Sequence, residues 1–317
     1  MRLSLDGVPY FTFLFFLLGS IVDFGRRNIL LKSASVAGWL GRGLEAFAHE
    51  RTGISSKAMR LISIGGALTE IVYSLHAHTE LVGVDTTSIY PTEASHLPNV
   101  GYARSLSSEG ILALRPTQLI ATEDAGPPIV LRQIINSGIP LSILPSGHQF
   151  IDVIDRVRTI GRLVHKTDAA EVLASRLLLE WNTTQKRVAH SKLNNTRVLF
   201  ILSQNPTQLM VGGEKTSAAA MIAYAGACNA ILGFSGFKPL TPEAVIAANP
   251  DVLLLTDQGM KAVGGIRGVL RFPGISQTRA GREQKVVSLE TMYLLGFGPR
   301  MPLAVAELNL LLQRATA

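Results

Sequence analysis

One short segment occurs twice in this chain, and this repeat constrains the fold more than any other feature of the sequence. The segment "LSSEGILALRPTQLIAT" (residues 106–122) returns 134 residues later as "LTPEAVIAANPDVLLLT" (240–256), with six identical positions and no gap. Each copy reads as a Ser or Thr N-cap, a Glu two residues later, a short apolar helix ended by Pro, and an apolar run suited to a buried strand. Because Glu and Pro recur at one offset, we interpret the repeat as two related lobes rather than a chance likeness.

A second similarity between the two halves of the chain extends the repeat toward the start of each lobe. Residues 60–84 and 197–234 both read as strand, helix and strand, which predicts an α/β fold with two Rossmann-like lobes, at 59–165 and 196–317. Residues 167–193 contain few helix breakers and carry apolar residues at helical spacing, so we expect one long, rigid helix between the lobes. Strands are expected in seven apolar runs: "RLISIG", "LVGVD", "QLIATE", "LSILPS", "RVLFIL", "DVLLLT" and "KVVSL".

The first 48 residues have the features of an export signal. "FTFLFFLLGSIV" (11–22) is too short to span a bilayer, and Arg26 and Arg27 open a segment close to a twin-arginine signal that ends in an A-x-A cleavage site at 46–48. The apolar run and the twin-arginine segment are competing export signals, so the start site of the protein stays open. The alternative to an export signal is an internal amphipathic helix. The single cysteine, Cys228, is not placed to carry a lipid. We therefore expect a soluble periplasmic protein without a lipid anchor.

Charge and motifs narrow the class of function. The first 48 residues hold five basic and three acidic residues, so their removal lowers the net charge from +7 to +5, which suits an anionic ligand or a membrane surface. No run of Lys or Arg is interleaved with aromatics, so nucleic acid is not indicated. The sequence has no nucleophile elbow, phosphate loop or metal-binding helix motif, and its last histidine is His190, so histidines of both lobes cannot share a metal. We expect a binding protein and not an enzyme.

The ligand is expected between the lobes, where the carboxyl ends of the strands meet. The turns that follow the predicted strands, or lie on the facing loops, are 65–66, 85–87, 102–104, 123–124, 146–148, 203–205, 237–238 and 257–261.

At this point the sequence resembles the periplasmic substrate-binding proteins of ABC importers for haem, cobalamin and siderophores. The likeness covers residues 59–317, and three segments make it similar to the haemin-binding branch: "LPNVGYARSLSSEGILALRPTQLIA", "GFKPLTPEAVIAANPDVLLLT" and "GISQTRAGREQKVVSLETMYLLGFGPRMPLAVAEL". The resemblance implies that haemin is a transported ligand rather than a catalytic group. It also implies a monomer that delivers its cargo to a permease dimer with its ATPase.

The resemblance implies that Tyr102, in the Gly-Tyr-x-Arg turn, is the axial ligand of the haem iron. Ferric iron is a hard ion that suits phenolate oxygen, and a free phenol has a pKa near 10, so a nearby cation such as Arg104 would favour the phenolate. Gly101 would let the backbone approach closely. The alternative is that Tyr102 is a half-buried turn aromatic and Arg104 a surface charge.

Residues of the second lobe, on the opposite side of the expected cleft, would complete the haem pocket. Phe237 stands where the branch usually has Tyr, so it can stack on the porphyrin but cannot ligate iron. Lys238, Lys261 and Arg104 are candidates for the propionates, although the lysines could equally be solvated. Met260, a loop side chain or water is left as a sixth ligand, and we favour five-coordinate iron.

Two carboxylates, Glu109 and Glu243, match the family positions that dock into arginine pockets of the two permease subunits. The repeat supplies one carboxylate per lobe for a twofold partner, but both could serve only the dipole of their own helix. Three alternatives stay open for the whole protein: a ferric siderophore or cobalamin as ligand, an enzyme acting on haem, and a scaffold without a role in transport. The long helix predicts a small motion of the lobes on binding.

Overall fold

The computed structural model describes residues 58–205 and 208–317, so the predicted export signal at 1–48 lies outside the described residues. Within these two ranges, no helix has both the length and the apolar character needed to cross a bilayer. The described residues belong to one compact unit.

The first lobe is built on a four-stranded parallel sheet with the strand order β2-β1-β3-β4. Its strands are short because each apolar run is closed by a turn or helix start. The strands are β1 (Leu61–Ile64), β2 (Leu81–Val84), β3 (Gln118–Thr122) and β4 (Leu141–Leu144). The helices are α1 (Gly66–Ser74), α2 (Ser108–Ala113), α3 (Pro128–Asn136) and α4 (Phe150–Leu163), with the 3-10 turns η1 (His78–Glu80) and η2 (Thr92–His96).

The second lobe has a six-stranded mixed sheet in which β10-β9-β5-β6-β8 form the path and β7 also pairs with β5. Strands β5, β9 and β10 are parallel to one another, β6 pairs antiparallel with β5, and β8 pairs antiparallel with β6. The strands are β5 (Arg197–Asn205), β6 (Gln208–Gly212), β7 (Cys228–Asn229), β8 (Phe237–Pro239), β9 (Val252–Thr256) and β10 (Val286–Leu289). The helices are α6 (Ser217–Tyr224), α7 (Pro242–Ala248), α8 (Asp257–Ala262), α9 (Ile266–Leu270), η3 (Ile275–Gln277), α10 (Arg279–Arg282), α11 (Thr291–Leu295) and α12 (Met301–Thr316).

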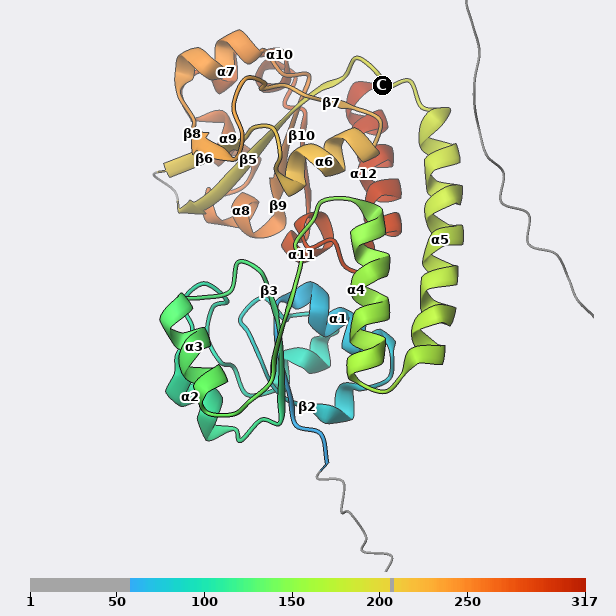
Figure 1. The fold of residues 1–317 in the computed structure, drawn as a ribbon. Coiled ribbons are helices and arrows are strands. Elements are labelled where there is room, and N and C mark those ends of the chain that lie inside the picture. Colours follow the sequence, from blue (N-terminus) through green and yellow to red (C-terminus); the bar gives the residue numbers. More distant parts are fainter. Residues whose placement is uncertain (1–57, 206–207) are drawn as a thin grey trace, which may run out of the picture. The chain divides into compact units, whose positions relative to one another are not determined.

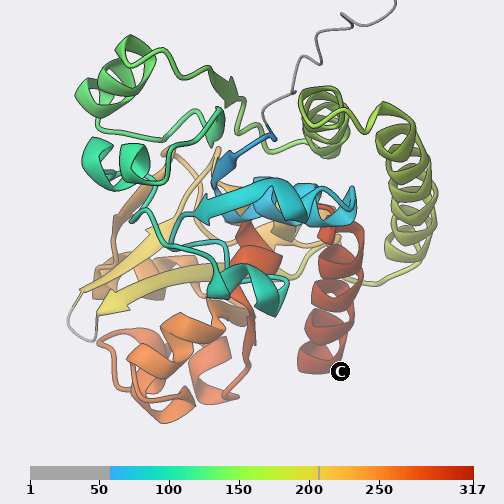
Figure 2. The ribbon, with the colours of Figure 1, turned by 90° about the horizontal axis from the view of Figure 1, so that it is seen from below.

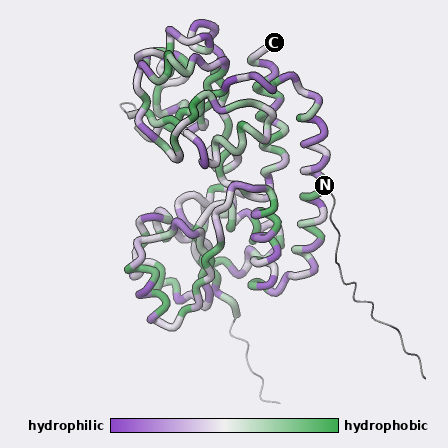
Figure 3. Tube along the Cα trace, turned by 45° about the horizontal axis from the view of Figure 1, so that its top comes forward, coloured by the Kyte–Doolittle hydropathy of each residue, from purple (hydrophilic) through white to green (hydrophobic). Residues whose placement is uncertain are grey.

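One long helix, α5 (Thr167–Ala189), lies between the two sheets in sequence and runs beside both lobes (Figure 1). It packs on α4 and α12, and Figure 2 shows α12 between α5 and the second sheet. Its residues alternate between hydrophilic and hydrophobic along the tube in Figure 3, as expected of a helix with one packed face and one exposed face. The predicted fold class, two α/β lobes joined by a long helix, is confirmed.

The two copies of the repeat form the same unit in both lobes. The first copy gives α2 and β3, and the second gives α7 and β9. Thr241 caps α7, because its hydroxyl accepts a hydrogen bond from Ala244 N at 3.2 Å. Ser107 occupies the N-cap position of α2 without a capping hydrogen bond, so only one of the two predicted caps forms.

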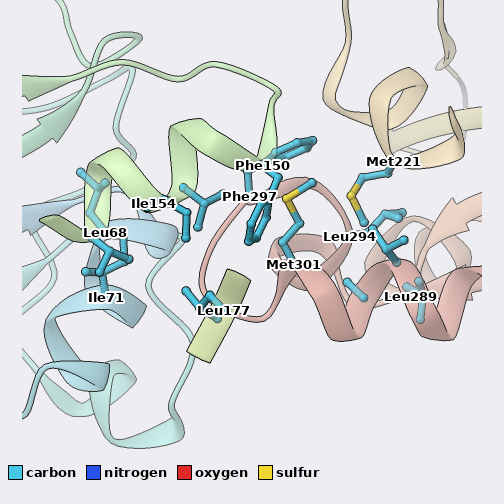
Figure 4. Packing of buried hydrophobic residues seen from close by; sticks show 14 of the residues in the cluster. Leu68, Ile71, Phe150, Ile154, Leu177, Met221, Leu289, Leu294, Phe297 and Met301 are labelled. Carbon is cyan, nitrogen blue, oxygen red and sulfur yellow. The ribbon is translucent and has the colours of Figure 1, made fainter. Parts of the chain in front are cut away.

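A single hydrophobic core connects the lobes. In the first sheet Leu61 faces this shared core while Ile62 faces a separate one, and in the second sheet Phe200 faces it while Ile201 does not. This alternation follows from the two-residue period of a strand. The shared core continues through α1, α4, α5, α6, α11 and α12, and Figure 4 shows its side chains from Leu68 to Leu289.

Polar contacts cross between the lobes at the edge of the shared core. Arg300 donates from Nε to Glu70 Oε2 at 2.9 Å, and its Nη2 bonds the second oxygen of that carboxylate. Burial raises the pKa of Glu70 despite the opposing effect of Arg300. Burial alone would lower the pKa of Arg300, but its bonds to Glu70 raise it. A second link joins Arg156 Nη2 to the carbonyl of Phe297 at 2.8 Å. The lobes are therefore held by apolar packing and by two arginines.

Candidate ligand-binding site

Tyr102 lies on a tight turn between β2 and α2, with its side chain 43% exposed. Gly101 has φ 97°, a conformation that L side chains rarely adopt. The side chain of Asn99 accepts a hydrogen bond from Gly101 N at 2.8 Å, and the carbonyl of Tyr102 accepts one from Ser105 N at 2.7 Å. The glycine therefore permits a turn that presents the tyrosine ring to solvent.

Backbone hydrogen bonds hold this turn on both sides. On one side Thr86 N, which follows β2, donates to the carbonyl of Gly101 at 3.0 Å. On the other side Gly126 N donates to the carbonyl of Ala103 at 2.8 Å, and Leu106 N donates to the carbonyl of Gly126 at 2.9 Å. The turn is thus fixed between the loops that follow β2 and β3, as expected at the carboxyl ends of neighbouring parallel strands.

A buried carboxylate, Asp85, orders the loop that holds the turn. Its Oδ1 accepts Gly65 N at 3.0 Å and Ser88 Oγ at 2.8 Å, and its Oδ2 accepts Thr87 Oγ1 at 2.7 Å. Thr87 Oγ1 in turn accepts Gly66 N at 2.8 Å. Asp85 is 1% exposed, so these partners offset the cost of removing a charge from water. The position of Asp85 directly after a strand indicates a site turn, but its three partner residues cannot be read from the sequence.

Arg104 is ion-paired and not free. Its Nε and Nη2 both contact Asp124 Oδ2, at 2.9 and 2.8 Å. Hydrogen bonding to Asp124 raises the pKa of Arg104, and the phenol of Tyr102 adds to that effect. Burial alone would raise the pKa of Asp124, but hydrogen bonds from Thr122 and Arg104 outweigh it and lower that pKa. The sequence placed Asp124 in a site turn and did not predict that it pairs with Arg104.

The second-lobe residues gather around β8. Phe237 is 38% exposed, and its ring meets the buried ring of Phe200 edge-on, with centroids 6.4 Å apart. Lys238 Nζ lies 4.6 Å from the centroid of the Phe234 ring, a cation–π contact. Phe237 therefore presents an aromatic face, and the charge of Lys238 is held beside another ring.

Helix α8 carries the other two predicted pocket residues, which lie in different environments. Met260 is partly buried and packs against the separate core of the second lobe. Lys261 is exposed. The helix is capped by Thr256, whose hydroxyl accepts Gly259 N at 3.0 Å. Among the described residues, no hydrogen bond, ion pair or ring contact joins Tyr102, Arg104 or Asp124 to Phe237, Lys238 or Lys261, so the predicted pocket residues form two separate groups, one in each lobe.

His148 follows β4, beside the link between Arg156 and Phe297. Its ring lies 5.5 Å from that of Phe297, and its carbonyl accepts Tyr224 Oη at 3.4 Å. Burial and then the charge of Arg156 lower the pKa of His148, which favours a neutral imidazole. No group of three or more His, Cys, Asp or Glu residues able to hold a metal ion occurs in the part of the chain that the structure describes.

Both predicted docking carboxylates are exposed in the first turn of a short helix, Glu109 in α2 and Glu243 in α7. Within residues 58–205 and 208–317 neither forms an ion pair with a basic side chain. The positive end of each helix dipole lies close to its carboxylate. The negative charges of both carboxylates nevertheless remain available to a cationic partner.

A cavity of about 850 Å³ lies elsewhere, where the connection from α5 to β5 meets the end of α12. Its charged lining residues include Asp251, Arg279 and Lys285. Arg279 pairs with Asp251 at 3.0 Å and Lys285 with Glu283 at 2.7 Å, so these charges have partners within the protein. We assign no ligand to this cavity.

Comparison with known proteins decides the family. Residues 61–292 match the periplasmic binding protein family, which is most of the chain. This chain belongs to that family. Members of the family bind substrates rather than transform them, which agrees with the expectation that the protein is not an enzyme.

Two solved structures share the fold of this periplasmic binding protein. The haem-binding protein BhuT, in complex with two haems, is 42% identical with a TM-score of 0.78, over 81% of this chain and 99% of BhuT. The haem-binding protein RhuT of Roseiflexus sp. RS-1, in apo form, is 38% identical with a TM-score of 0.79, over 82% of this chain and 100% of RhuT.

Two sequence relatives are more distant. The ABC transporter substrate-binding lipoprotein YvrC of Bacillus subtilis (strain 168), an uncharacterized protein, is 24% identical over 257 residues, 80% of each chain. The vitamin B12-binding protein of Pectobacterium atrosepticum is 25% identical over 198 residues, 62% of this chain and 71% of the relative. YvrC is named as a lipoprotein, so the absence of a lipid anchor in the present protein stays a prediction.

Proposed function

We propose that this protein captures haemin in the periplasm and delivers it to the permease of an ABC importer. Tyr102 carries the proposal: its half-exposed phenol stands on a glycine-led turn that backbone hydrogen bonds fix on both sides. A fixed phenolate oxygen suits ferric iron, and the guanidinium of Arg104 belongs to the same turn. The identities of 42% and 38% to haem-binding proteins, each covered almost entirely, support haemin as the cargo.

The remaining pocket residues divide their roles by what each side chain already contacts. Phe237 offers an aromatic face for the porphyrin but no ligand atom, so we propose five-coordinate iron with Tyr102 as the protein ligand. Lys238 and Lys261 provide positive charge for the propionates. Met260 would have to leave the core of the second lobe to reach iron, and we therefore assign it to packing at the pocket edge.

Delivery is proposed to use Glu109 and Glu243, one exposed carboxylate from each lobe. A charged group without an ion-pair partner at the surface is suited to a basic pocket on another protein. A soluble monomer that meets a permease dimer would then offer one carboxylate to each subunit.

Cobalamin is the second candidate ligand, because the sequence relatives include vitamin B12-binding proteins. The identity to that relative is 25%, against 42% to the haem-binding BhuT, so haemin is favoured. Tyr102 also separates the two ligands, since the cobalt of cobalamin already carries its axial ligands, whereas the iron of haemin has an axial position that a phenolate can occupy.

The test is a titration with haemin and, separately, with cyanocobalamin, followed by visible absorption. Tyr102→Phe is compared with Tyr90→Phe, which removes a phenolic hydroxyl from another half-exposed ring of the same lobe (46% exposed). We expect the wild-type protein and Tyr90→Phe to give a saturable high-spin ferric phenolate spectrum that Tyr102→Phe lacks. Saturable binding of cyanocobalamin alone, or an unaltered haemin spectrum in Tyr102→Phe, would overturn the proposal.

A further inference from the structure

The guanidinium of Arg104 is held by one edge only. Its Nε and Nη2 both point to the same carboxylate oxygen, Asp124 Oδ2, at 2.9 and 2.8 Å. These two donors lie along one edge of the planar fork. The remaining donors, on Nη1 and the outer side of Nη2, form no hydrogen bond to any residue that the structure describes. Asp124 therefore fixes the orientation of Arg104 and leaves its other edge available.

The available edge belongs to the same turn as the phenol. Tyr102 and Arg104 are separated only by Ala103, which is 6% exposed and whose carbonyl is bonded to Gly126 N at 2.8 Å. Gly126 and Asp124 both lie on the loop after β3, so one loop holds the backbone of the turn and the side chain of Arg104 together. The phenol and the guanidinium are also close enough to interact electrostatically.

An exposed arginine has many rotamers, and restricting them costs free energy when a ligand must do it. The side chain of Arg104 is 63% exposed, so without Asp124 nothing else in the described structure would restrict it. We propose that Asp124 is a positioning residue for the haem ligand, which holds Arg104 by its Nε edge so that the other edge serves the phenolate of Tyr102. This inference rests on the proposed function.

Asp124 could affect the phenolate in two ways with opposite signs. If Asp124 acts through Arg104, removing Asp124 takes the cation of Arg104 away from the phenolate. The electrons of the phenolate then rise in energy. The phenolate-to-iron charge-transfer band must then move to longer wavelength. If Asp124 acts only as a nearby negative charge, its removal lowers the energy of those electrons, and the band moves to shorter wavelength.

The experiment compares the haemin complexes of Asp124→Ala, Arg104→Ala and the double variant. We expect both single variants to shift the band to longer wavelength and to release haemin to apomyoglobin about tenfold faster, the effect of losing one charge-assisted hydrogen bond. The double variant should match Arg104→Ala. Asp124→Glu should restore the band, and Glu123→Ala, which removes the neighbouring exposed charge, should leave it in place. A shift to shorter wavelength in Asp124→Ala, or no shift, would overturn the inference.

A measurement without haemin separates this inference from the proposed function. In the ligand-free protein with ¹⁵N-labelled arginine, the Nε–H signal of Arg104 should exchange slowly with water, and Asp124→Ala should abolish that protection. Rapid exchange in the wild-type protein would refute the positioning role even if haemin binds. Slow exchange together with no haemin spectrum would instead refute the proposed function and leave the Arg104–Asp124 geometry standing.

Discussion

Replacing Phe297 by alanine should destabilise both lobes at once. The ring is 3% exposed and belongs to the shared core, where Figure 4 shows it near Phe150 and Ile154 of α4 and Met301 of α12. Removal of a buried phenyl group costs about 3–5 kcal/mol, from lost transfer free energy and the cavity left behind. The carbonyl that accepts Arg156 remains in the variant. Since about 1 kcal/mol lowers Tm by about 2–4 °C in a protein of this size, we expect a fall of roughly 6–20 °C.

The assay is thermal and urea unfolding followed by circular dichroism, with amide hydrogen exchange to resolve the lobes. A single transition should move to lower urea, and protection should fall both in α4 and in β9. Phe237→Ala is the matched control, because the same ring is removed from a site that is 38% exposed, and we expect a loss of about 1 kcal/mol or less. Two separate transitions, or lost protection confined to the second lobe, would refute the shared core.

Three further predictions concern the site and its surroundings. Gly101→Ala should lose about 1–2 kcal/mol of stability, because alanine is strained at φ 97°, and should weaken haemin binding; a denaturation curve and a titration measure both. His148 has a pKa below its usual value, so the unfolded chain takes up a proton first as the pH falls. Its contribution is complete above about pH 6.5 and is lost below it, and His148→Gln should flatten this part of the stability-against-pH curve; an unchanged slope would contradict it. Glu109→Ala with Glu243→Ala should abolish haemin transport in a reconstituted importer while leaving the haemin titration unchanged, and retained transport would exclude these carboxylates from docking.

The strands and the long helix could be predicted because their signals are local. An apolar run such as "DVLLLT" forms β9, and the breaker-free segment 167–193 contains α5. Strands β6 and β8 are not among the predicted runs, and of the strand expected after the helix in 197–234 only the two residues of β7 form. β8 is even exposed at all three positions. Its strand conformation comes from pairing with β6, which only the folded chain provides.

The residues of the candidate site could be found more readily than their partners. A Gly-Tyr-x-Arg turn after a strand is visible in the sequence, but the pairing of Arg104 with Asp124 joins positions 20 residues apart. The contact between Arg300 and Glu70 spans 230 residues and depends on how the lobes meet. Ser107 shows the limit within one segment, since it occupies the N-cap position without making the hydrogen bond.

The shared core has a consequence for how a transporter would tell a loaded protein from an empty one. Side chains of both lobes pack in one apolar cluster that arginine contacts flank, so a wide rotation of one lobe against the other would expose apolar surface to water. This cost disfavours a wide rotation, so the empty protein would present nearly the same surface as the loaded one. The empty form would therefore compete with the loaded form for the permease. Discrimination would have to come from the cargo itself, or from small rearrangements of the loops at its rim, such as the turn that carries Tyr102.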